Sequence, residues 1–163
     1  IVVFTFVLLI SAFYRMVLYE TAYGYTYLRI FVQTFMILLF IIFIINLVYI
    51  WYRRFPIIKS YILCSLIIYI ILNFANVDVI IAKNNISRYY STGEIDIYYL
   101  PELSYDAIPE MTKLLDSDDK EIVNAVNDYF EREKEILEGQ GQWQSYNFSK
   151  IKALKVLDKY INK

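Results

Sequence analysis

The sequence predicts an all-α fold: a transmembrane helix bundle with three spans, followed by a small helical tail domain. Three long apolar stretches that are nearly free of charge support this prediction, Val2–Tyr14, Ile30–Tyr52 and Ile57–Ala75. The second stretch runs for 23 residues without a charged side chain. A helix of about 20 apolar residues is long enough to cross the hydrocarbon core of a bilayer.

Composition also divides the chain into an apolar first half and a charged second half. The chain is 58% hydrophobic, whereas soluble domains are about 45–50% apolar. Residues 1–82 carry five Lys or Arg against two acidic residues (+3), while residues 83–163 carry 11 basic and 15 acidic residues (−4). We therefore predict a transmembrane region over 1–82 and a polar tail domain over 83–163. Nucleic acid is not an expected partner, because no basic stripe covers a face.

The three spans are expected at about 1–14, 30–52 and 57–81. The connector over 16–28 is rich in tyrosine, which prefers the headgroup level of a membrane. This connector is therefore expected to lie along the interface. The third helix has no internal Gly or Pro and is expected to continue to about Asn85.

The tail shows helical periodicity in three segments. Ser104 is expected to cap the first helix, the second covers about 118–137, and the last covers about 147–161. Before them, alternating residues over 95–99 are compatible with a short extended piece. Asp116–Asp119 is interpreted as a helix cap rather than a cation loop, because it lacks the Gly turn and the bidentate Glu of such loops.

Charge is distributed unevenly between the tail helices. Residues 94–138 carry 14 acidic and four basic side chains, whereas residues 150–163 carry five Lys and Asp158. A loop at Gly139–Gly141 separates the two segments. We therefore expect the last helix to pack antiparallel on the acidic helix.

Six polar residues form the candidate site. Counting crossings places the end of the first span, the start of the second and the end of the third on one side of the membrane, where ionisable groups tend to pair or to serve function. One interpretation is a polar interface site for an anionic headgroup, a glycan or a polar substrate. The alternative is that ion pairs fasten the helix ends, with an arginine near Glu20 or Asp78. The residues are Arg15, Glu20, Arg29, Asp78, Asn85 and Arg88.

Three amides lie within the spans, at Gln33, Asn46 and Asn73. Buried amides in membrane helices usually bond a neighbouring helix. Gln33 and Asn46 do not share a helix face, as the polar lining of a pore would require. The amides are therefore interpreted as packing contacts between helices.

The sequence offers little catalytic chemistry. Cys64 is the single cysteine and histidine is absent, which removes the commonest general base and the commonest metal ligand. We identify no catalytic residue, no metal site and no cofactor signature, and the sequence favours a protein that is not an enzyme.

Five strings of the sequence carry a family resemblance. They are residues 14–20, residues 23–29, residues 76–82 with Asn85 and Arg88, residues 103–109 and residues 143–147. In this order they resemble the C-terminal part of uncharacterised bacterial multi-spanning membrane proteins, the domain-of-unknown-function families four-one-five-three and four-one-seven-three. The resemblance implies a longer parent with further N-terminal spans, and it supplies no activity.

The leading functional hypothesis is a non-catalytic integral membrane protein of the bacterial envelope whose helical tail acts as an interaction or regulatory module. The alternatives are the C-terminal bundle of a transporter or channel, or of a membrane enzyme acting on lipid-linked envelope substrates. Expected partners are the lipid bilayer and either further spans of the parent or another membrane protein.

The expected location is the cell membrane, which the chain crosses several times. The turn after the second span holds Arg53, Arg54 and Lys59. Basic turns favour the cytoplasmic side, so the tail is expected outside the cytoplasm.

Overall fold

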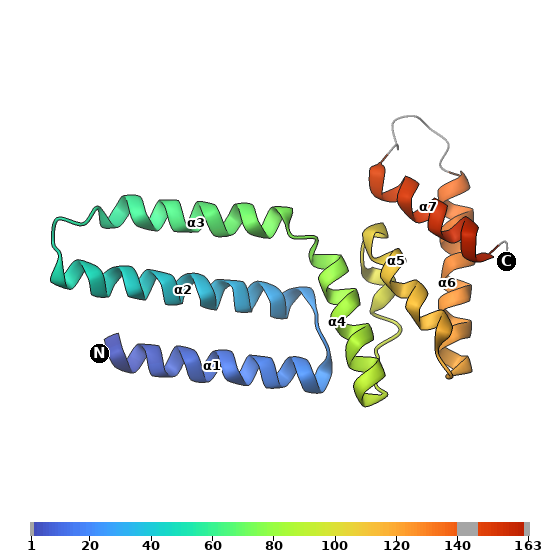
Figure 1. The fold of residues 1–163 in the computed structure, drawn as a ribbon, viewed down its shortest axis with the longest axis horizontal. Helices are drawn as coiled ribbons and strands as arrows, with labels where there is room; N and C mark the ends of the chain where they lie inside the picture. The colour runs from blue at the N-terminus through green and yellow to red at the C-terminus, as the bar shows by residue number, and fades with distance from the viewer. Residues whose placement is uncertain (1, 140–146, 162–163) are drawn as a thin grey trace. The chain divides into compact units, whose positions relative to one another are not determined.

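The structure is a computed structural model that describes residues 2–139 and 147–161. The chain divides into two compact units, Ile1–Val77 and Asp78–Lys163, so the division falls shortly before the predicted boundary at 82. Every regular element of the described residues is a helix (Figure 1), which confirms the predicted all-α class. The predicted loop at Gly139–Gly141 falls mostly outside the described residues, as does most of the string at 143–147.

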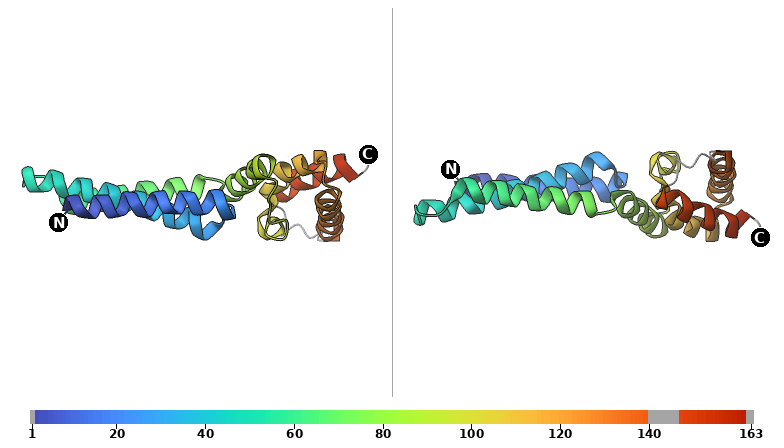
Figure 2. Two further views of the ribbon diagram at one scale, coloured as in Figure 1. Left: turned by 90° about the horizontal axis from the view of Figure 1, so that it is seen from below. Right: turned by 90° about the horizontal axis from the view of Figure 1, so that it is seen from above.

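The first unit consists of α1 (Val2–Tyr23), α2 (Tyr27–Trp51) and α3 (Ile57–Phe74). The helices are joined by short turns and lie side by side, with α2 between the other two (Figure 1). Turned by 90°, the three helices form a thin layer (Figure 2). The end of α1, the start of α2 and the end of α3 therefore lie at the same end of this layer.

All three helices are long and apolar enough to cross a membrane. The 25 residues of α2 form one continuous helix, as predicted, which is about 38 Å long at 1.5 Å per residue. Ile45 is the single buried residue of α2. Its other apolar side chains are exposed or half-buried, as expected for a helix whose surroundings are hydrocarbon.

The first helix is longer than the sequence predicted. It continues through Arg15 to Tyr23, so most of the expected connector is helical and the turn comprises residues 24–26. Charged side chains do not interrupt the backbone hydrogen bonds of a helix. The helix ends where Gly24 adopts a φ of 82°, a left-handed conformation that glycine adopts readily.

The third helix is shorter than predicted. It ends at Phe74, and a separate helix, α4 (Val77–Thr92), begins after residues 75–76. Ala75 is extended, with a ψ of 118°. Asp78 lies in the first turn of α4, where a carboxylate interacts favourably with the helix dipole. The predicted single helix from Ile57 to about Asn85 is therefore wrong.

The second unit contains mainly short helical elements. After α4 come η1 (Leu100–Glu102), η2 (Tyr105–Ala107), α5 (Ile108–Met111), η3 (Thr112–Asp116), α6 (Lys120–Gly139) and α7 (Phe148–Ile161). Their core is apolar, and its largest fully buried side chains are Phe130, Ile81, Leu100, Ile108, Met111, Leu114 and Leu157.

The stretch before α5 differs from the prediction in two ways. No strand forms within residues 2–139 or 147–161. Asp96 Oδ1 instead accepts hydrogen bonds from the N–H groups of Tyr98 and Tyr99, both at 3.1 Å, which folds the segment into a turn. Ser104 precedes a 3₁₀ turn and its side chain makes no cap bond.

The helix cap at Asp116–Asp119 is confirmed. Asp119 Oδ1 accepts the N–H of Glu121 at 2.9 Å, at the start of α6. The backbone N–H of Asp119 in turn donates to Ser117 Oγ at 3.1 Å. These bonds satisfy donors that the first turn of a helix otherwise leaves unpaired.

The last two helices pack together, but they cross rather than lie alongside one another as an antiparallel pair. Figures 1 and 2 show α7 crossing α6 steeply. Lys134, towards the end of α6, pairs with Asp158, towards the end of α7, at 2.8 Å. In an antiparallel pair the end of α6 would meet the start of α7. The crossing arises because α7 packs on η2 and α5 as well as on α6.

Candidate functional site

A polar cluster surrounds the turn between α1 and α2. We call Glu20, Gly24, Arg29 and Gln33 the hairpin cluster. Glu20 lies in the last turns of α1, and Gly24 begins the turn itself. Arg29 and Gln33 lie in the first two turns of α2 and share a face, because they are four residues apart.

Hydrogen bonds join the two helices through this cluster. Gln33 Nε2 donates to Glu20 Oε2 at 2.6 Å. Arg29 Nη1 donates to the Gly24 carbonyl, and the N–H of Gly24 donates to the Glu20 carbonyl at 2.9 Å. The turn thus holds the arginine side chain against the backbone at the end of α1.

Glu20 is the most unusual member of the cluster. Its exposed fraction is 2%, and its Oε1 atom has no hydrogen-bond partner among the residues that the structure describes. Leaving a buried acceptor unpaired costs about 1–3 kcal/mol, and more for a charged group. Arg29 attracts the carboxylate electrostatically, which offsets part of this cost.

The expected ion pair of Glu20 with an arginine is not observed in the described part of the first unit. Arg29 binds the Gly24 carbonyl, and Glu20 accepts from Gln33. Arg15 is exposed, and it precedes Glu20 by five positions, which places the two side chains about 140° apart around α1. The hairpin cluster therefore forms without Arg15.

The other three candidate residues belong to α4 in the second unit. Asp78 Oδ1 accepts the backbone N–H of Ser104 at 3.0 Å. Arg88 pairs with Glu94 Oε2 at 2.9 Å and also donates to the Glu94 carbonyl. Asn85, between them on the helix, is 8% exposed. Asp78 and Arg88 thus hold the chain that follows α4.

Sequence reasoning missed that Gln33 is the partner of Glu20. The available signal was a polar side chain in an apolar helix, one turn after Arg29. The prediction that span amides join helices is confirmed at Gln33, which bonds Glu20 of α1, and at Asn46, whose Oδ1 accepts from the Tyr61 hydroxyl of α3 at 2.7 Å. Asn73 instead bonds the Tyr69 carbonyl of its own helix.

The family model described as domain of unknown function (DUF4153) matches residues 1–114. The chain belongs to the DUF4153 family. The match includes the hairpin cluster and α4, and ends before α6 begins. No curated protein and no solved structure matches the chain.

The family assignment agrees with the first of the two families that the sequence resembles. Its description states no activity, so membership transfers no reaction and no ligand to this chain. The membrane character of the chain comes from its three apolar helices.

Proposed function

We propose that this chain is a non-catalytic part of a bacterial envelope protein, in which the second unit is an interaction module held at the membrane by the three spans. The observation that carries this proposal is an acidic face on α6. Its carboxylates are exposed, and they are Glu121, Asp128, Glu131, Glu135 and Glu138.

These five residues lie on one face of α6, which we call the acidic stripe. At 100° per residue they fall within an arc of about 100° on the helix surface, and they extend over about 26 Å. The buried face of α6 is formed by other residues, including Val126, Phe130 and Leu137. The acidic stripe is therefore not needed for the core of the unit.

The chemistry of the stripe suits a basic segment of a protein partner. Exposed charges add little to the stability of their own fold. Across an interface, complementary charges accelerate association and select the partner, and salt weakens this effect. A row of carboxylates on a rigid helix is consistent with a reversible, salt-sensitive contact.

Photocrosslinking in membranes tests the proposal. A photoreactive residue is placed at Asn124, which is exposed on the same face of α6. We expect an adduct with a protein partner, and we expect it to be lost when Glu121, Asp128 and Glu135 are changed to Gln, Asn and Gln. The control changes Lys152, Lys155 and Lys159, three exposed residues of α7, to Gln. An adduct that survives the acidic changes, or is lost equally in the control, refutes the proposal.

We also propose that the second unit lies outside the cytoplasm. Arg53, Arg54 and Lys59 are concentrated where α2 ends and α3 begins, whereas the second unit follows the other end of α3. Basic turns favour the cytoplasmic side. Lys152 is exposed and is replaced by Cys in a chain that also carries Cys64→Ser. A maleimide that cannot cross membranes should label intact cells. Labelling that requires lysis would place the tail in the cytoplasm.

A further inference from the structure

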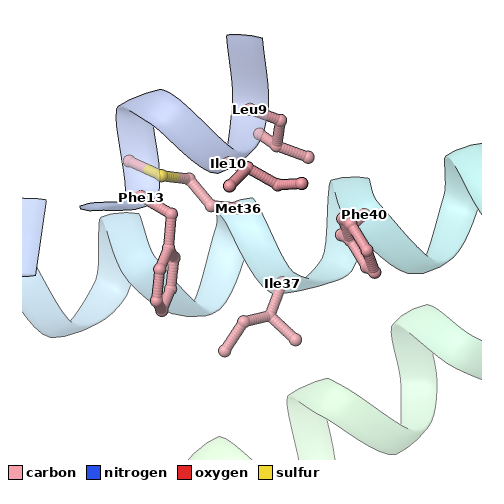
Figure 3. A pocket seen from close by; sticks show the side chains of 6 residues that line it. All are labelled: Leu9, Ile10, Phe13, Met36, Ile37 and Phe40. Carbon is pink, nitrogen blue, oxygen red and sulfur yellow. The ribbon is translucent and has the colours of Figure 1, made fainter. Parts of the chain in front are cut away.

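A groove runs along the first unit between α1 and α2. Leu9, Ile10 and Phe13 line it from α1, and Met36, Ile37 and Phe40 line it from α2 (Figure 3). Its volume is about 210 Å³, and every lining side chain is apolar. The groove lies within two helices that are long enough to cross a membrane.

The groove and the hairpin cluster belong to the same seam. Glu20 follows Phe13 by seven residues, and Arg29 precedes Met36 by seven residues. Seven residues return a helix to nearly the same face after two turns, and they separate the groove from the cluster by about 10 Å along each helix. The seam thus has a charged end at the turn and an apolar section towards the middle of the helices.

Aromatic side chains place the charged end at the headgroup level. Tyr19 and Tyr23 stack with ring centroids 5.5 Å apart, and Tyr27 stacks on Phe31 at 6.4 Å. Tyrosine is enriched where hydrocarbon meets the polar headgroups. The apolar groove therefore lies at the depth of the acyl chains.

The polar atoms of the cluster select the chemistry of the ligand. Glu20 Oε1 is an acceptor without a partner in the described residues, so it requires a donor. Arg29 uses Nη1 on the Gly24 carbonyl, and a guanidinium has five N–H donors. Its remaining donors suit a phosphate. A headgroup that satisfies both residues carries a phosphate and an ammonium with N–H donors.

We propose that this seam binds a phospholipid with a primary ammonium headgroup, of the phosphatidylethanolamine class. One acyl chain occupies the groove, Arg29 holds the phosphate, and Glu20 accepts the ammonium. Because Oε1 is enclosed, the Glu20 carboxylate turns towards the headgroup when the lipid enters. Gln33 retains its bond to Oε2 and limits how far the carboxylate turns.

Lipid titration of the purified full chain in detergent, read by native mass spectrometry, tests this site. The probes are phosphatidylethanolamine, phosphatidylcholine and phosphatidylglycerol with identical acyl chains. Phosphatidylcholine has the same net charge but no N–H donor on its ammonium, and phosphatidylglycerol has no ammonium. We expect phosphatidylethanolamine to bind about tenfold more tightly than either, the factor that one charge-assisted hydrogen bond contributes.

Two variants test the headgroup contact and the acyl-chain groove separately, and a third is a control. Glu20→Gln should bring phosphatidylethanolamine binding down to that of phosphatidylcholine, and Ile37→Trp should weaken all three lipids by filling the groove. Arg15→Gln, at an exposed position away from the seam, should leave the preference unchanged. Far-UV circular dichroism checks that each variant remains helical. Equal binding of the three lipids by the unmodified chain, or a preference that survives Glu20→Gln, would overturn the proposal.

Discussion

Replacement of Leu157 by alanine should destabilise the second unit more than any loss of charge. Leu157 lies on α7 with an exposed fraction of 0%, and α7 packs against α6, η2 and α5. Truncating a buried leucine to alanine costs about 2–5 kcal/mol, depending on how far the cavity collapses. This is a large part of the roughly 5–15 kcal/mol that stabilises a typical domain.

The competing contribution is the ion pair between Lys134 and Asp158. Its N–O distance is 2.8 Å, but the Asp158 side chain is 54% exposed. Exposed pairs contribute about 0–1 kcal/mol. Asp158→Asn should therefore have a small effect, and Lys152→Glu, on an exposed position of α7, should have almost none.

Hydrogen exchange of the full chain in detergent distinguishes the two contributions. Protection of the α6 amides should fall at least about 30-fold with Leu157→Ala and at most about fivefold with Asp158→Asn, since 1.4 kcal/mol corresponds to a factor of ten. The amides of α2 provide an internal reference in the same sample. A larger loss of protection with Asp158→Asn would show that charge, rather than burial, holds α7 in place.

Three further changes test individual contacts. Burial raises the pKa of Tyr129 above its ordinary value of 10.0, so the folded state favours the neutral phenol; this stabilisation is complete below about pH 10 and is lost as pH rises further. The thermal stability of the tail should therefore stay constant up to about pH 10 and fall as pH rises towards about pH 11, and Tyr129→Phe should reduce that loss; an unchanged pH dependence would exclude Tyr129 as its source. Tyr61→Phe removes the hydrogen bond to Asn46 and should cost about 0.6 kcal/mol in unfolding of the full chain in detergent; a loss several times larger would mean that this bond is more than one packing contact. Asp78→Ala removes the acceptor of the Ser104 N–H and should speed exchange of that amide, whereas unchanged exchange would show that the bond does not protect it.

The positions of the spans could be predicted more accurately than their ends. An uninterrupted apolar stretch identifies α2 because charged side chains are excluded from hydrocarbon. The same criterion ended the first span at Tyr14, although the helix continues to Tyr23. Backbone hydrogen bonding continues past Arg15 until Gly24 changes the backbone conformation. Solubility in lipid and helix formation are separate properties, and they coincide only in the middle of a span.

Glu20 and Arg29 were predicted as candidate site residues, but the groups to which they form hydrogen bonds were not. Arg15 or Arg29 was expected to pair with Glu20 or Asp78, because ionisable groups at or within a membrane tend to pair. The structure pairs Glu20 with Gln33 and directs Arg29 to a carbonyl. Which polar group meets Glu20 depends on the face of α2 that turns towards α1. That choice is made by the packing of both helices, which a single sequence does not display.

In the tail, too, the helices could be predicted from the sequence but their packing could not. Periodic apolar residues predicted α6 and α7, because a helix of the tail must cover one apolar face to be stable. Opposite charge suggested an antiparallel pair, yet α7 crosses α6 and also covers η2 and α5. The all-α class and the apolar faces of α6 and α7 follow from local sequence, since they depend on residues within a few turns of one another. The partner of Glu20 and the direction of α7 were decided only by tertiary structure, because each depends on surfaces contributed by segments distant in the chain.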